Sequence, residues 1–146
     1  MAHYLLNFSD DHRDQAAALL KAKMWGVSPM EPHRDALAPG DHALIYLPIP
    51  KAEFIGRAVL ETAVHEWTPL EAKAYPGDSP SGVLLSNVEE WDPAVPMDSV
   101  VQRIDPTASN PRVQANAAAG FPMGVVRITA HEFDAALALS RQARGT

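Results

Sequence analysis

The stretch Trp25-Gly26-Val27-Ser28 is the feature that most limits how this chain can fold. Upstream, residues 4–8 are apolar and predict a short strand, and residues 9–24 predict a helix. Downstream, Pro39-Gly40-Asp41 predicts a tight turn that leads into two more strands. A tryptophan and a glycine between a helix end and a strand meander suit a loop where a small β-barrel can hold a flat aromatic ligand.

The predicted helix over residues 9–24 has N-cap candidates, one apolar face and a glycine shortly after its C-terminal end. Ser9 and Asp10 are both good N-cap residues, and Gly26 supplies the backbone freedom needed where the chain leaves the helix. Apolar side chains recur at helical spacing and predict the face that packs inward: Ala16, Leu19, Leu20 and Met24.

Further strands are predicted at residues 42–48, 53–67, 83–91 and 125–128. Gly56 inside the second of these predicts a bulge or a close approach of another backbone segment. Strict alternation along this strand places one set of residues on a single face: Phe54, Gly56, Ala58, Leu60 and Thr62.

Three shorter helical signals follow along the chain. Thr68 is a predicted N-cap with Pro69 at the first helical position, and residues 95–104 predict one helical turn after Pro96. Thr129 and Glu132 form a capping box that opens the last helix. The inner face of that helix is predicted from Phe133, Ala136, Leu137 and Ser140. Residues 105–124 carry no strong pattern.

These patterns predict an α+β fold in one domain over residues 1–146. The expected architecture is a small open β-barrel of about five to six mostly antiparallel strands, flanked by about two to three helices. The length suits one domain with a real core. No apolar run is long enough to span a membrane, and the N-terminus has no secretory signal, so a cytoplasmic location is expected.

The sequence specifies no catalytic or metal chemistry. There are no cysteines, which excludes disulfides, thiolate nucleophiles and Cys-metal sites. The six histidines show no metal-ligand spacing, and no phosphate-binding glycine loop occurs. Ser81-Gly82 lacks the context of a nucleophile elbow, and Glu89 and Glu90 point to opposite faces of a strand. We therefore expect neither a metal nor a cofactor.

The formal net charge of −6 argues against binding to duplex DNA mainly through phosphate neutralisation. The charge is unevenly distributed, because residues 60–98 contain many acidic residues and a single basic residue, Lys73. Three arginines fall in residues 100–130 and are candidate contacts to a nucleic-acid backbone: Arg103, Arg112 and Arg127. The other interpretation is scattered solubilising charge.

Most aromatic residues are expected in the core. Trp25 is the exception, because its expected loop position suits a stacking platform worth about 1–3 kcal/mol per base. Trp25 is therefore predicted to be partly exposed in a cleft, and its removal is predicted to spare the fold. Trp67 or Trp91 is predicted to be mostly buried.

The ordered series of motifs resembles the EVE domain, a PUA-like domain related to the YTH domain. The resemblance covers nearly the whole chain and rests on these segments: Phe8-Ser9-Asp10-Asp11, Met24-Trp25-Gly26-Val27, residues 39–46, Phe54-Ile55-Gly56, and residues 122–129 with Glu132-Phe133. YTH domains hold N-methylated adenine in an aromatic cage, and EVE domains are implicated in recognising modified bases such as ring-methylated cytosine. The chain departs from the family in its first strand, where EVE domains usually carry a tryptophan and Tyr4-Leu5-Leu6 stands here.

The resemblance implies a ligand pocket and roles for its residues. Trp25 corresponds to a cage wall, with Tyr75 as the nearest candidate for a second wall. A loop at the end of the first strand would reach a base edge with Phe8, Ser9 and Asp10. Tyr46 would face or flank the pocket, and Gly26, Ser28 and Pro48 complete it. The apolar wall that senses a methyl group would come from Val27, Pro48 or Met123.

The function implied is a non-enzymatic reader of a modified nucleobase in DNA or RNA, recruited by a partner protein. One alternative is a PUA-like enzyme, a nuclease or a hydrolase acting on a nucleoside, with Lys23, His33 or Asp41 in its pocket. Another is an interaction module with a vestigial pocket. The sequence names neither the base nor the kind of nucleic acid.

Overall fold

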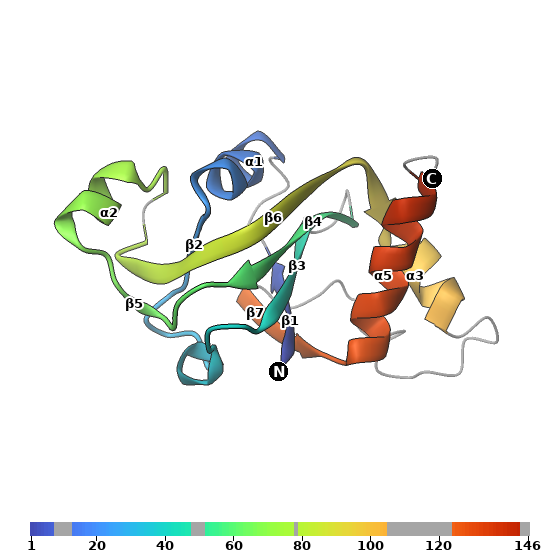
Figure 1. The fold of residues 1–146 in the computed structure, drawn as a ribbon, viewed down its shortest axis with the longest axis horizontal. Helices are drawn as coiled ribbons and strands as arrows, with labels where there is room; N and C mark the ends of the chain where they lie inside the picture. Colours follow the sequence, from blue (N-terminus) through green and yellow to red (C-terminus); the bar gives the residue numbers. More distant parts are fainter. Residues whose placement is uncertain (8–12, 48–51, 78, 105–123, 144–146) are drawn as a thin grey trace.

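The computed structural model describes residues 1–7, 13–47, 52–77, 79–104 and 124–143 (Figure 1). Their strands form a seven-stranded mixed sheet in the order β2-β6-β4-β3-β1-β7, with β5 paired to β6 beside this path. The strands are β1 (His3–Asn7), β2 (Met24–Gly26), β3 (His42–Leu47), β4 (Glu53–Leu60), β5 (His65–Glu66), β6 (Ser81–Pro96) and β7 (Gly124–Ile128). The helices are α1 (Arg13–Ala22), α2 (Pro69–Ala74), α3 (Met97–Ile104) and α5 (Ala130–Ala143), with a 3-10 turn, η1, at Arg34–Ala36.

The central strands β1 and β3 run parallel and are buried on both faces of the sheet. Their side chains alternate between two apolar clusters, as the two-residue period of a strand requires. The first, the α1 cluster, includes Tyr4, Leu6, Leu19, Leu20, Trp25, Val27, Ile45, Ile55, Leu60 and Val125. The second, the α5 cluster, includes Leu5, Leu44, Tyr46, Phe54, Trp91, Met97, Phe133 and Ala136.

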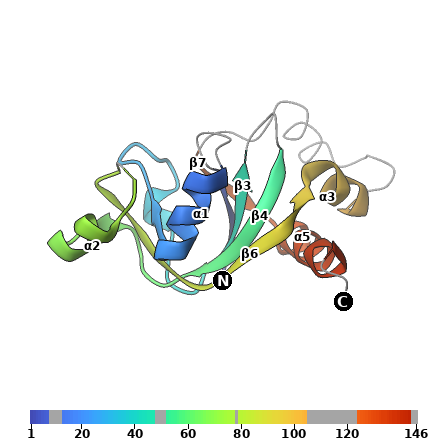
Figure 2. The same ribbon diagram turned by 90° about the horizontal axis from the view of Figure 1, so that it is seen from above.

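Strand β6 joins the two ends of the molecule. Its first residues pair with β2 and β5, and the rest of the strand pairs with β4. Figure 1 shows α2 at one end of this long strand and the α3–α5 pair at the other, and Figure 2 shows α1 lying across one face of the sheet. The sheet is open, as the sequence led us to expect.

The first helix ends earlier than predicted. Lys23 takes a positive φ of 60°, which an α-helix cannot accommodate, and the chain turns directly into β2. The helix therefore ends at Ala22, and Trp25 lies in a strand rather than in a loop. The N-cap candidates Ser9 and Asp10 fall outside the described residues.

The predicted strand over residues 53–67 is divided into β4 and β5. The pairing of β4 with β6 shifts register between Phe54 and Gly56, which confirms the bulge, and shifts again between Arg57 and Val59. Simple alternation therefore fails. Phe54 packs in the α5 cluster, whereas Leu60 packs in the α1 cluster, so the single face predicted for them was wrong.

The predicted capping box of Thr129 with Glu132 is present, and the predicted N-cap Thr68 also forms a capping box, with Glu71. The expected single turn after Pro96 is α3, an eight-residue helix. The weakly patterned residues 105–123 lie outside the described part of the chain. None of the helices described is long and apolar enough to cross a membrane.

Candidate ligand pocket

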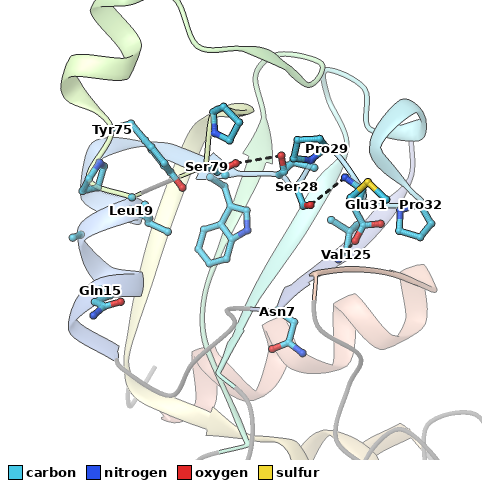
Figure 3. Close-up of a pocket in the computed structure, with 18 residues that line it drawn as sticks. Asn7, Gln15, Leu19, Ser28, Pro29, Glu31, Pro32, Tyr75, Ser79 and Val125 are labelled. Carbon is cyan, nitrogen blue, oxygen red and sulfur yellow. Dashed lines mark hydrogen bonds between the residues drawn. The ribbon is translucent and has the colours of Figure 1, made fainter.

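A cavity of about 810 Å³ lies between α1, the segment that follows β2, and the segment that follows α2 (Figure 3). Tyr75 and Leu19 lie on one side of it, and Glu31 and Val125 lie on the other. Four consecutive residues singled out in the sequence line it: Trp25, Gly26, Val27 and Ser28. Most of the other lining side chains are apolar, with polar groups from Asn7, Gln15, Ser28, Glu31 and Ser79.

Trp25 contributes to both the core and the cavity. It pairs with Val83 in the ladder between β2 and β6, and its side chain belongs to the α1 cluster. Only 5% of Trp25 is exposed, so the predicted partial exposure was wrong, although the predicted cavity lies beside it. Trp91 is fully buried, as expected, and Trp67 is half-buried.

Tyr75 supplies a second aromatic wall. It is the C-cap residue of α2, where its backbone N–H donates to the carbonyl oxygen of Glu71 at 2.8 Å. Its hydroxyl lies over Gly26, where an added Cβ would collide with it. Trp25 and Tyr75, 50 residues apart in sequence, thus both line one cavity.

The backbone of Val27 fixes the segment after β2. Its N–H donates to the carbonyl oxygen of Ser81 at 2.9 Å, and its own carbonyl oxygen accepts from the hydroxyls of Ser81 at 3.0 Å and Ser79 at 3.3 Å. Arg34 adds a donor from Nη1 to the same carbonyl at 3.3 Å and to the Ser81 hydroxyl at 2.9 Å. No sequence pattern predicts this role for Arg34, because its side-chain partner Ser81 is 47 residues away in the chain.

Glu31 closes one side of the cavity. One carboxylate oxygen accepts from the backbone N–H of Val125 at 2.8 Å, and the other accepts from the backbone N–H of His33 at 2.7 Å. Its side chain is only 6% exposed. Glu31 was not among the predicted site residues. The only feature of the sequence that could have pointed to it is its position between Pro29 and Pro32, where an acidic residue is not part of a helix.

The structure does not bring Tyr46 to the cavity. Tyr46 is buried in the α5 cluster on the other side of the sheet, with its ring 5.1 Å from that of Phe54. Burial, with a smaller contribution from Asp98, raises the pKa of Tyr46 to about 12. This environment suits a neutral core phenol.

The remaining predicted site residues are dispersed or lie outside the described part. Arg127 is exposed on β7, with its guanidinium 5.5 Å from the centre of the Tyr4 ring, and Arg103 belongs to α3. The following residues lie outside the described ranges: Phe8, Ser9, Asp10, Pro48, Arg112 and Met123.

Asp41 and His33, two of the residues considered for an enzymatic pocket, have partners within the fold. The carboxylate of Asp41 accepts from the backbone N–H groups of Ala2 at 3.0 Å and Ala38 at 3.1 Å, which fixes the turn before β3. His33 lies beside Glu31, with 3.4 Å between Nδ1 and the carboxylate. Within the described ranges, no cluster of three His, Asp or Glu residues has the geometry to hold a metal ion.

Comparisons with known proteins identify the fold. No family model and no curated protein sequence matches the chain. Human THYN1, solved in complex with DNA that contains 5-methylcytosine, is similar with a TM-score of 0.62 and 18% identity over 96% of this chain and 98% of that chain. A hypothetical protein from Leishmania major is similar with a TM-score of 0.65 and 17% identity over 99% and 97% of the two chains.

The ASCH protein from Zymomonas mobilis is similar with a TM-score of 0.54 and 15% identity, over 94% of this chain and 95% of that one. The likenesses extend over nearly the full length of each chain. They confirm the α+β, PUA-like fold that the resemblance to EVE domains implied.

Proposed function

We propose that this chain is a non-enzymatic module that binds a modified nucleobase of DNA or RNA in the cavity lined by Trp25 and Tyr75. The observation that carries the proposal is the cavity itself. Its volume of about 810 Å³ falls in the usual range for small-molecule sites, and its lining is mostly apolar with a few polar groups. Of the two aromatic residues in the lining, the half-buried Tyr75 presents the more accessible ring, because Trp25 is only 5% exposed.

In the proposed mechanism, the base leaves its strand and inserts between the segments after β2 and after α2. Stacking on an aromatic ring contributes about 1–3 kcal/mol per base. A methyl group on the base would contact Val27 or Val125, which adds about 0.8 kcal/mol. The hydroxyl of Ser28 accepts from the backbone N–H of Met30 and would donate its proton to the base edge. The hydroxyl of Ser79 donates to the carbonyl oxygens of Val27 and Ser81, so it would act toward the base as an acceptor.

The comparison with human THYN1 supports this proposal, because that protein was solved with DNA containing 5-methylcytosine and shares the fold. The acidic net charge of this chain favours recognition through the base over tight binding of the phosphates. Arg127, exposed on β7 near the cavity residue Val125, is the proposed contact to the backbone. A partner protein would raise the local concentration of nucleic acid.

An enzymatic role has less support. A general base must be able to take a proton from the substrate. Glu31 is the only carboxylate among the described lining residues, and both its oxygens already accept backbone hydrogen bonds. We therefore favour binding over hydrolysis at this cavity.

The test is a titration of fluorescently labelled oligonucleotides, each with or without one 5-methylcytosine, with the wild-type protein and the Tyr75→Ala variant. The modified strand is expected to bind the wild type more tightly, and Tyr75→Ala is expected to weaken that binding roughly 5- to 150-fold. Tyr46→Phe, on the other face of the sheet, is the matched control. Equal affinity for both strands would exclude 5-methylcytosine as the recognised base, and unchanged binding by Tyr75→Ala would place any site elsewhere.

A further inference from the structure

Helix α2, which ends at the cavity wall Tyr75, has little packing of its own. It spans six residues, and none of them is buried. A helix this short is not stable by itself in water. Its position therefore depends on the contacts that its two ends make with β5 and with the segment after Tyr75.

Trp67 lies at the centre of those contacts. Its ring centroid is 5.0 Å from that of Tyr75, and the ring of His65 meets it edge-on at 5.6 Å. Its indole Nε1–H donates to the carbonyl oxygen of Ser79 at 2.9 Å, and its backbone N–H donates to that of Pro80 at 3.0 Å. Trp67 thus links both sides of α2, yet it does not line the cavity.

Glycines leave the space that these two rings occupy. A Cβ at Gly82 would lie 2.7 Å from the Trp67 ring, and a Cβ at Gly77 would lie 2.7 Å from the Tyr75 hydroxyl oxygen. Gly82 pairs with Gly26 across the ladder between β6 and β2, and Gly26 is the residue beneath the Tyr75 hydroxyl. The Trp67 and Tyr75 rings therefore pack directly against glycine backbone, at positions where any side chain would collide with them.

From this arrangement we propose that Trp67 is a positioning residue for the cavity: it holds the Tyr75 ring at the distance from Trp25 that the ligand requires. The inference rests on the proposed function, because it takes Tyr75 as a wall of the binding site. His65 supports Trp67 from the other side, fastened by Nε2 to the carboxylate of Glu71 at 2.9 Å. The consequence is that a residue outside the cavity controls affinity.

The experiment compares Trp67→Phe with Trp91→Phe. Trp67→Phe keeps an aromatic ring but removes the indole N–H that donates to the carbonyl oxygen of Ser79. Trp91→Phe is the same substitution in the α5 cluster, on the other side of the sheet. The chain has three tyrosines, so 3-fluorotyrosine labelling gives three ¹⁹F resonances, and Tyr75→Phe assigns one of them. Trp67→Phe is expected to shift or broaden the Tyr75 resonance while sparing those of Tyr4 and Tyr46, and Trp91→Phe is expected to leave the Tyr75 resonance unchanged.

Affinity for the oligonucleotide with one 5-methylcytosine is measured on the same samples. Loss of one hydrogen bond is expected to weaken binding roughly 2- to 12-fold in Trp67→Phe, with Trp91→Phe close to the wild type. An unmoved Tyr75 resonance, or a moved resonance with unchanged affinity, overturns the proposal. If the wild type binds no oligonucleotide but the Tyr75 resonance moves, the proposed function fails and the positioning of Tyr75 by Trp67 stands.

A measurement on the wild-type protein covers the case in which Trp67→Phe does not fold. Cross-relaxation between the indole protons of Trp67 and the ring protons of Tyr75 is expected, because the two ring centroids are 5.0 Å apart. Its absence would show that the two rings are not held together in solution, and the inference would then be wrong.

Discussion

The carboxylate of Glu31 accepts a hydrogen bond from the backbone N–H of Val125 at 2.8 Å, across a separation of 94 residues. This bond ties the segment after β2 to the edge strand β7. The second oxygen of the carboxylate accepts from the backbone N–H of His33, so one side chain fixes both the segment and its neighbouring strand. Two residues that line the cavity from opposite ends of the sequence are thereby held together.

Replacing Glu31 with alanine removes both bonds and leaves the N–H of Val125 without this acceptor. We expect Glu31→Ala to lower the free energy of unfolding by about 1–3 kcal/mol, because hydrogen bonds to charged groups are the stronger ones. Urea unfolding measures this. Glu66→Ala, at an exposed position in β5, is the control and should stay within about 0.5 kcal/mol of the wild type.

Replacing Trp25 with alanine is expected to cost about 3–5 kcal/mol of stability, the usual penalty for deleting a core tryptophan. The 5% exposure of Trp25 is the reason, and it reverses the expectation drawn from a loop position. Thermal unfolding tests this directly. A melting temperature close to that of the wild type would show that Trp25 contributes little to the stability of the core. For binding assays Trp25→Phe is the better variant, because it keeps an aromatic ring in the core.

Replacing Thr129 with alanine removes the N-cap of α5, whose hydroxyl accepts from the N–H of Glu132 at 3.1 Å. The expected loss is about 1 kcal/mol, measured by denaturant unfolding, with ligand binding unchanged. Thr68→Ala removes the equivalent cap of α2, which buries no residue. Its effect on global unfolding should therefore be smaller, and an equal effect would mean that α2 unfolds together with the core.

We expect the order of α2 to depend on pH, because the His65 imidazole lies 2.9 Å from the Glu71 carboxylate. The backbone carbonyl of Ala63, followed by the Glu71 carboxylate, raises the pKa of His65 above its usual 6.5. The N-cap backbone of Thr68, with a smaller effect of His65, lowers the pKa of Glu71 below 4.5. A raised histidine pKa stabilises the fold below pH 6.5, and this contribution is lost as the pH rises through the folded value.

A lowered carboxyl pKa stabilises the fold above pH 4.5, and this contribution is lost as the pH falls through the folded value. Both contributions are therefore complete between pH 4.5 and 6.5. The protection of the α2 amides from hydrogen exchange, taken relative to the intrinsic exchange rate at each pH, is expected to be greatest in that window and to fall above it. His65→Gln should abolish the change above pH 6.5, and an identical pH profile in the variant would contradict the pairing.

Short-range features of this fold were predictable from the sequence because their causes lie within a few residues. The capping boxes at Thr68 and Thr129 and the turn at Gly40, which has φ at 91°, each depend on local backbone and side-chain chemistry. The central strands β1 and β3 were equally clear, because continuous apolar runs mark strands buried on both faces.

Where the aromatic residues lie could not be predicted from the sequence and became clear only from the tertiary structure. Trp25 is in a strand because residues 24–26 pair with residues 82–84 of β6. Nothing within residues 24–26 themselves indicates this pairing. Tyr75 reaches the cavity and Tyr46 does not, although the resemblance to EVE domains implied a place at the pocket for both. The resemblance to EVE domains implied a pocket with Trp25 and Tyr75 among its walls. Which of the other aromatics belong to it was decided by strand pairing and bulges, because a shift of one residue moves a side chain to the opposite face of a sheet.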